Sequence, residues 1–141
     1  MGIKLSNEVK QLVDRSNFAH LATIMSDGSP HSAPVWIGRE GDHLLVCTEA
    51  GSLKGKNTLR DPRVSLSLVD FVDPYSGVQI RGRVIERRPD PELKYYDAFS
   101  LKYVGKPWPY RNEESPIVLI IEATRALYSK QPFEHAPAKT G

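Results

Sequence analysis

Several chemical groups are scarce or missing in this sequence. Cys47 is the only cysteine among 141 residues, so no disulfide can form within one chain. The four histidines show no spacing typical of a zinc site, and we therefore predict no metal centre. The Walker A loop, the Rossmann glycine fingerprint and the nucleophile elbow are also absent. A net charge of +2 is too small to indicate a nucleic-acid-binding protein.

Long apolar runs are missing as well. The first residues, 1–13, mix charged and apolar side chains, unlike a signal peptide or a membrane span. Hydrophobic residues make up 40% and charged residues 26%, which is typical of one soluble globular domain. We therefore expect a single domain over residues 1–141, without membrane or nucleic-acid partners. A lone free cysteine fits a reducing compartment, so we expect a cytoplasmic protein.

One basic stretch, residues 48–63, is unusual for its position. Ser52 is a good N-cap for a short helix that ends before Pro62. Lys54 and Lys56 then lie near the helix N-terminus, where the macrodipole disfavours cations. Free N–H groups and lysines together bind phosphate, so the stretch predicts an anion site. A solvated basic turn is the alternative.

The remaining pattern is mainly that of antiparallel β-strands. Two consecutive hairpins over residues 18–48 predict a meander, in which Pro34 marks an edge or a bulge. Gly82, in the middle of a strand, indicates a bend or a close approach. So many antiparallel strands tend to close into a barrel, which removes their edges. We expect strands at 18–25, 30–38, 43–48, 63–69, 77–87 and 116–129, helices at 6–16 and 91–104, and a loose tail at 131–141.

Five sequence motifs follow one another in a specific order: Leu21–Ile24, Asp27–Trp36, Lys54–Asn57, Asp61–Ser65 and Val78–Val84. Taken in this order, they resemble the flavin/deazaflavin oxidoreductase superfamily, the pyridoxamine 5'-phosphate oxidase-like split β-barrels. Within it, the chain is most similar to the branch that uses the deazaflavin coenzyme F420. The agreement is good from Phe18 to Val84, weakens over 91–115, and returns in the last strand.

The resemblance implies an FMN-binding-type split barrel of six or seven strands. It also implies a homodimer with two cofactor sites in grooves at the subunit interface. The cofactor would be F420, or FMN as the alternative. The resemblance implies that Lys54, Lys56 and Asn57 bind the phosphate, with Thr48 at the phosphate or the ribityl chain. It implies that one strand runs along the ring and contributes Ser32, Ala33, Pro34, Val35 and Trp36. It also implies that a strand of the second subunit reaches the site with Gln79 and Arg81.

The function expected from this resemblance is hydride transfer between F420 and a small conjugated molecule. An FMN-dependent flavin reductase or a pyridoxamine-phosphate-oxidase-like protein is the alternative, and a non-catalytic flavin-binding or deazaflavin-binding protein is another. The proton donor stays unknown at this stage. Tyr75, Trp108 and Tyr110 lie on expected loops, where they line a substrate pocket or form dimer contacts.

Overall fold

Seven strands and three helices make up the computed structural model, which describes residues 2–136. The strands all pair antiparallel in one sheet, so the expected mainly β fold is confirmed. The elements, in chain order, are α1 (Asn7–Asp14), β1 (Ala19–Ile24), β2 (Pro30–Val35), β3 (Gly38–Glu40), β4 (His43–Glu49), α2 (Leu53–Arg60), β5 (Arg63–Val69), β6 (Ser76–Pro89), α3 (Lys94–Val104) and β7 (Pro116–Lys130).

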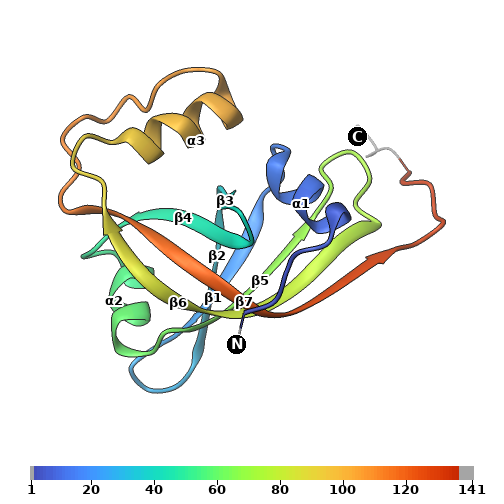
Figure 1. Cartoon of the computed structure of the whole chain (residues 1–141), viewed down its shortest axis with the longest axis horizontal. Coiled ribbons are helices and arrows are strands. Elements are labelled where there is room, and N and C mark those ends of the chain that lie inside the picture. The colour runs from blue at the N-terminus through green and yellow to red at the C-terminus, as the bar shows by residue number, and fades with distance from the viewer. Residues whose placement is uncertain (1, 137–141) are drawn as a thin grey trace, which may run out of the picture.

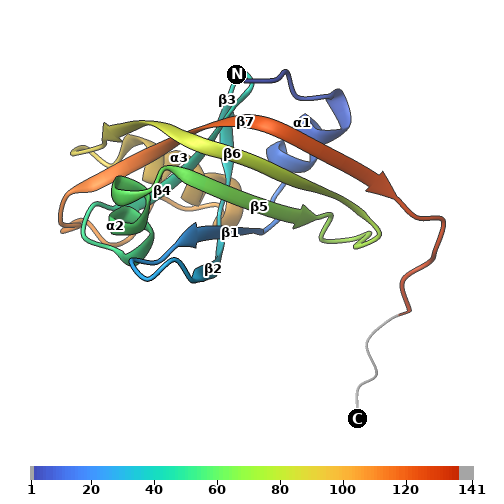
Figure 2. The same ribbon diagram turned by 90° about the horizontal axis from the view of Figure 1, so that it is seen from below.

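The strand order explains why the sheet curls. It runs β2-β1-β5-β6-β7-β4-β3, so β2 and β3 lie at opposite edges although only Trp36 and Ile37 separate them in the chain. Three consecutive Cα–Cα steps span at most about 11 Å, so the two edges have to come close together. Figure 2 shows the segment from β2 to β3 crossing behind β5, β6 and β7. The result is a barrel that stays split between its edges.

This arrangement corrects the expected meander. Strand β2 pairs only with β1, whereas β3 pairs with β4, so the predicted strand 30–38 is two strands that break at Trp36 and Ile37. The turn predicted at 39–42 shortens to Gly41 and Asp42, because Arg39 and Glu40 belong to β3. Pro34 lies in the edge strand β2, as expected, because it cannot donate to a ladder.

The barrel interior is aliphatic, as the alternation along the strands predicts. Helix α1 closes it with Val9, Leu12 and Val13. A second cluster lies outside the barrel, where Phe99 of α3 packs against β4 and β7. Figure 1 shows α2 and α3 toward one end of the molecule and α1 toward the other. Strands β5 and β6 contribute Val64, Leu66, Leu68, Val78 and Ile80 to the interior.

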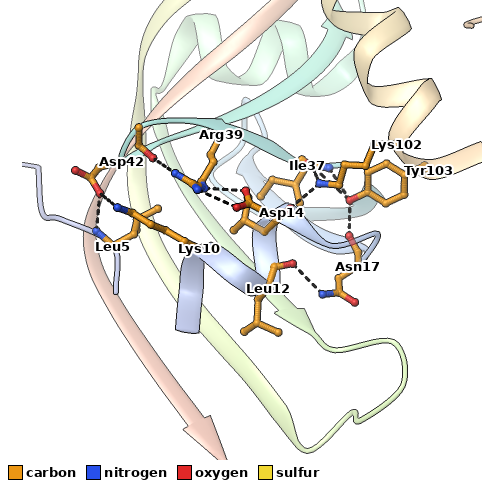
Figure 3. Close-up of polar contacts among 12 residues, drawn as sticks. Leu5, Lys10, Leu12, Asp14, Asn17, Ile37, Arg39, Asp42, Lys102 and Tyr103 are labelled. Carbon is orange, nitrogen blue, oxygen red and sulfur yellow. Dashed lines mark hydrogen bonds and ion pairs between the residues drawn. The ribbon is translucent and has the colours of Figure 1, made fainter. Parts of the chain in front are cut away.

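Side chains of α3 complete the backbone hydrogen bonding at the split. Ile37 is fully buried and lies between β2 and β3, outside both ladders. Its N–H donates to the Tyr103 hydroxyl at 3.1 Å, and its carbonyl accepts from Lys102 Nζ at 2.7 Å. The Tyr103 hydroxyl donates in turn to the Asn17 carbonyl at 2.5 Å (Figure 3). Since buried backbone groups need partners, these contacts bind α3 to the split.

Strand β6 bends where glycine is required. Its register with β7 shifts between Arg81 and Gly82, and a Cβ on Gly82 would lie 2.4 Å from the Glu122 carbonyl oxygen. The expected bend and close approach are confirmed. The predicted tail at 131–141 has neither helix nor strand over 131–136, and its remainder lies outside the described residues. No helix within residues 2–136 is long and apolar enough to cross a bilayer.

Candidate functional site

A cavity of about 480 Å³ opens where four parts of the chain meet. These parts are the end of β2, the end of β4, the start of α2, and α3 with the loop that follows it. The walls are largely apolar and aromatic, which is typical of small-molecule sites. Its apolar lining includes Phe18, Pro34, Val35, Trp36, Phe99 and Trp108, and its polar lining is Thr48, Glu49, Ser52, Lys54, Tyr96 and Glu113.

The N-terminus of α2 is fixed at this cavity by local contacts. The Ser52 hydroxyl accepts from the Gly55 N–H at 3.1 Å, which confirms Ser52 as the N-cap. It also hydrogen-bonds the Thr48 hydroxyl at 2.6 Å, which ties the helix to the end of β4. A Cβ on Gly55 would lie 2.4 Å from the Glu49 carbonyl oxygen, so glycine lets the helix approach the strand this closely.

The two lysines of the predicted anion site occupy different environments. Lys54 is half-buried and lines the cavity, and burial lowers its pKa. It forms no ion pair with any residue of the described range. Lys56 is exposed and does not line the cavity. Two residues along an α-helix turn the side chain by about 200°, so only one of the pair can face the cavity.

Asn57 faces the barrel instead of the cavity. It is 1% exposed, and its side-chain amide donates to the Thr23 hydroxyl at 3.0 Å. Its carbonyl oxygen accepts from Arg60 at 2.8 Å. In this chain Asn57 therefore connects α2 to β1, and its predicted contact with a phosphate stays a prediction.

The other predicted site residues divide into two groups. Pro34, Val35, Trp36 and Thr48 line the cavity beside Lys54, whereas Ser32 and Ala33 lie earlier in β2 and do not. Gln79 and Arg81 point to the outer face of β6 and border two other grooves. Strand β6 thus brings neither of them to the cavity of its own chain.

Trp36 forms a wall of the cavity that is held from behind. Its ring stacks on Tyr103 with 5.1 Å between the centroids and 5° between the planes. Trp108 meets Trp36 edge-on, at 5.8 Å. Tyr103, which supplies hydrogen-bond partners for the backbone at the split, thus also supports this wall of the cavity.

Helix α3 and its following loop are set by two aspartates. Asp90 is buried and accepts from the N–H groups of Lys94, Tyr95 and Tyr96, which is why the helix begins at Lys94 instead of 91. Asp97 accepts from the Trp108 N–H at 3.0 Å and from Arg111 at 2.7 Å. These bonds hold the loop so that Trp108 and Glu113 face the cavity.

The sequence interpretation missed several residues of this cavity. Tyr96 and Phe99 lie in the helix expected at 91–104; both are buried, and both line the cavity. Glu49 and Glu113 carried no signal, because neither belongs to a recognisable motif. Of the three loop aromatics, only Trp108 lines this cavity. Tyr75 borders another groove, and Tyr110 is 66% exposed.

Cys47 is not a nucleophile in this site. Burial, with a smaller contribution from Asp90, raises the pKa of its thiol well above its usual range, so the reactive thiolate is not formed near neutral pH. Within residues 2–136, no three His, Cys, Asp or Glu side chains are grouped to hold a metal ion.

The fold and the cavity define a split barrel of the flavin-binding kind. The chain belongs to the pyridoxamine 5'-phosphate oxidase family, whose profile matches residues 5–128. No curated protein matches the chain. The family confirms the fold and the superfamily resemblance that the sequence motifs indicated.

Solved structures give more detailed similarities. An F420 reductase is 26% identical, with 84% of this chain and 94% of that chain covered and a TM-score of 0.78. A conserved hypothetical protein from Mycobacterium tuberculosis is 25% identical, with 99% of this chain and 94% of that chain covered and a TM-score of 0.76. A putative pyridoxamine 5'-phosphate oxidase from Listeria innocua is 16% identical, with 86% and 95% covered and a TM-score of 0.67, and shows the fold alone.

Proposed function

We propose that this chain is a cytoplasmic, homodimeric oxidoreductase that uses the deazaflavin coenzyme F420 to reduce or oxidise a small conjugated molecule. The observation that carries the proposal is Lys54, a half-buried cation without an ion pair in the described residues, beside an aromatic-walled cavity. Similarity to an F420 reductase supports the choice of cofactor. FMN is the alternative, because both cofactors carry a phosphate on a ribityl chain.

The cavity fits the phosphate end of such a cofactor. A half-buried ammonium without a counter-ion is destabilised, and a bound phosphate would remove that cost. The backbone N–H groups of Leu53 and Lys54, at the start of α2, have no acceptor among residues 2–136. Beside the half-buried ammonium of Lys54, these two N–H groups form the kind of helix terminus that binds phosphate.

The cavity also fits a flat ring. Pro34, Val35 and Trp36 supply an apolar wall, and β2 is an edge strand, which leaves alternate N–H and C=O groups unpaired on its free side. These groups are available to the polar edge of a tricyclic ring. When bound, the cofactor supplies the hydride chemistry, while the chain positions it and excludes water.

A second copy of the chain completes the proposed site. Gln79 and Arg81 lie on the outer face of β6, away from the cavity of their own chain, so their predicted role at the cofactor requires a homodimer. Sedimentation at micromolar concentration tests this part: we expect twice the mass of one chain. A monomer would leave Gln79 and Arg81 without a role at the site.

Fluorescence titration with F420 and, separately, with FMN tests the cofactor. We expect tight binding of F420. Tight binding of FMN alone would assign the chain to the flavin branch, and binding of neither would contradict the enzyme proposal. If reduced F420 binds to the protein but enones and quinones do not reoxidise it, the non-catalytic alternative is favoured.

A further inference from the structure

Arg87 of β6 makes two hydrogen bonds to the first half of α2. Its guanidinium donates to the Gly55 carbonyl at 2.9 Å and to the Thr58 hydroxyl at 2.9 Å. The Thr58 hydroxyl donates in turn to the Lys54 carbonyl at 2.7 Å. Arg87 is therefore joined to the turn that carries Lys54 at two neighbouring carbonyls, directly at one and through a hydroxyl at the other.

No carboxylate explains the position of this arginine. Arg87 is half-buried and forms no ion pair with any residue in the range 2–136. Burial lowers its pKa, yet a guanidinium stays charged near neutral pH. Holding a charge partly out of water without a counter-ion costs free energy. The only polar side-chain contacts of Arg87 in this part of the chain are those with α2.

The charge of Arg87 adds to an excess that α2 already has. The helix contains Lys54, Lys56 and Arg60 and no acidic residue. Asp61, which follows the helix, pairs with Arg63 at 2.7 Å. The macrodipole disfavours cations near the first turn of a helix, so an anion bound at this turn would stabilise the whole arrangement.

The guanidinium is suited to fix the helix in place. Its planar group directs two nitrogens, Nη1 and Nη2, at two acceptors at once, which a lysine ammonium on a flexible stem does not reproduce. The same turn is held to β4 by the 2.6 Å hydrogen bond between the Thr48 and Ser52 hydroxyls. With contacts to two strands, the first turn of α2 has a defined position.

We propose that Arg87 is a positioning residue of the phosphate site. It holds the first turn of α2 to β6 and so fixes Lys54 and the free N–H groups of Leu53 and Lys54 for a doubly charged phosphate. Arg87 does not line the cavity, so it acts through the helix and does not touch the ligand. The inference rests on the proposed function, because it concerns the same phosphate.

The test compares the affinity for a phosphorylated ligand with that for its phosphate-free counterpart, FMN against riboflavin and F420 against its phosphate-free chromophore. Arg87→Met keeps most of the apolar stem and removes the guanidinium. We expect its preference for the phosphorylated ligand to fall at least about fivefold, with the affinity for the phosphate-free ligand within about twofold. Arg87→Lys keeps the charge without the planar fork; we expect a fall of at least about threefold, and this variant serves if Arg87→Met does not fold.

Arg88→Met is the matched control, because it removes the same group from the next residue of β6. The Arg88 guanidinium binds Glu86 at 2.8 Å and Glu40 at 3.2 Å, and among residues 2–136 it contacts no side chain of α2. Its preference should stay within about twofold of that of the unchanged protein. An equal fall in Arg88→Met would overturn the role of Arg87.

Two further results would contradict this role while leaving the cofactor proposal intact. One is an undiminished preference in the Arg87 variants when Lys54→Gln loses it. The other is an equal loss of affinity for phosphorylated and phosphate-free ligands, which would make Arg87 a purely structural residue. If the unchanged protein showed no preference for phosphate, both the proposed phosphate site and the role of Arg87 would be wrong.

Discussion

The Ile37 N–H donates to the Tyr103 hydroxyl at 3.1 Å, at the point where the chain passes from one edge of the sheet to the other. The two residues are 66 positions apart in the sequence. Because the Tyr103 ring also stacks on Trp36, one side chain both completes the split of the barrel and supports the cavity wall. The stability of the fold and the shape of the site therefore depend on the same contact.

Replacing that hydroxyl should destabilise the fold while keeping the stacked ring. We expect Tyr103→Phe to lower the free energy of unfolding by about 1–3 kcal/mol, because the buried Ile37 N–H loses its acceptor and the Asn17 carbonyl its donor. Urea unfolding measures this. Tyr110→Phe is the control, since that side chain is 66% exposed, and we expect a change within about 0.5 kcal/mol. Equal effects of the two variants would contradict the assigned role.

The close approach of α2 to β4 predicts a contrast between two neighbouring glycines. A Cβ on Gly55 would lie 2.4 Å from the Glu49 carbonyl oxygen and 2.7 Å from that of Ala50, whereas one on Gly51 meets nothing within 4 Å. Gly55→Ala should cost about 1–3 kcal/mol and weaken cofactor binding, because Lys54 moves with the helix. Gly51→Ala should leave both thermal unfolding and cofactor affinity nearly unchanged. If Gly55→Ala changed neither the free energy of unfolding nor the cofactor affinity, α2 would not be held this close to β4.

The buried position of Lys54 predicts a pH dependence of cofactor binding. In the protein without cofactor, burial lowers the pKa of Lys54 below 10.5, the ordinary value for a lysine. A bound phosphate should raise this pKa again. Only the protonated lysine attracts the phosphate, so affinity should be highest below the lowered pKa. It should then fall by up to about tenfold per pH unit as pH rises toward the pKa of the complex. Titrations over this range measure the effect.

Arginine at this position provides the comparison for that experiment. Its guanidinium stays charged over the whole range, so Lys54→Arg should flatten the fall in affinity at high pH. An identical fall in both proteins would assign the pH dependence to another group.

Local patterns predicted the parts of the fold that local physics decides. Ser52 was identifiable as a cap because a cap hydroxyl satisfies an N–H three residues away, and Ser6 caps α1 in the same way. The break at Trp36 was not predictable from its own strand, whose pattern continues without interruption. It depends on Tyr103 and Lys102, which supply the missing backbone partners from 66 and 65 residues away.

The same distinction applies to the site. The position of Lys54 at a helix N-terminus is a local feature and was predicted, but the argument applied equally to Lys56, which helix rotation turns to solvent. Glu49, Tyr96 and Glu113 come from three separate segments that only the folded chain brings to one cavity. No spacing in the sequence connects them.

The most direct test of the central claim, that Lys54 holds a cofactor phosphate, compares ligands with and without that phosphate. Affinities of FMN against riboflavin, and of F420 against its phosphate-free chromophore, should be measured for the unchanged protein, Lys54→Gln and the exposed control Lys56→Gln. We predict that the preference for the phosphorylated ligand falls at least about tenfold in Lys54→Gln and less than about threefold in Lys56→Gln. An undiminished preference in Lys54→Gln would contradict the proposed site.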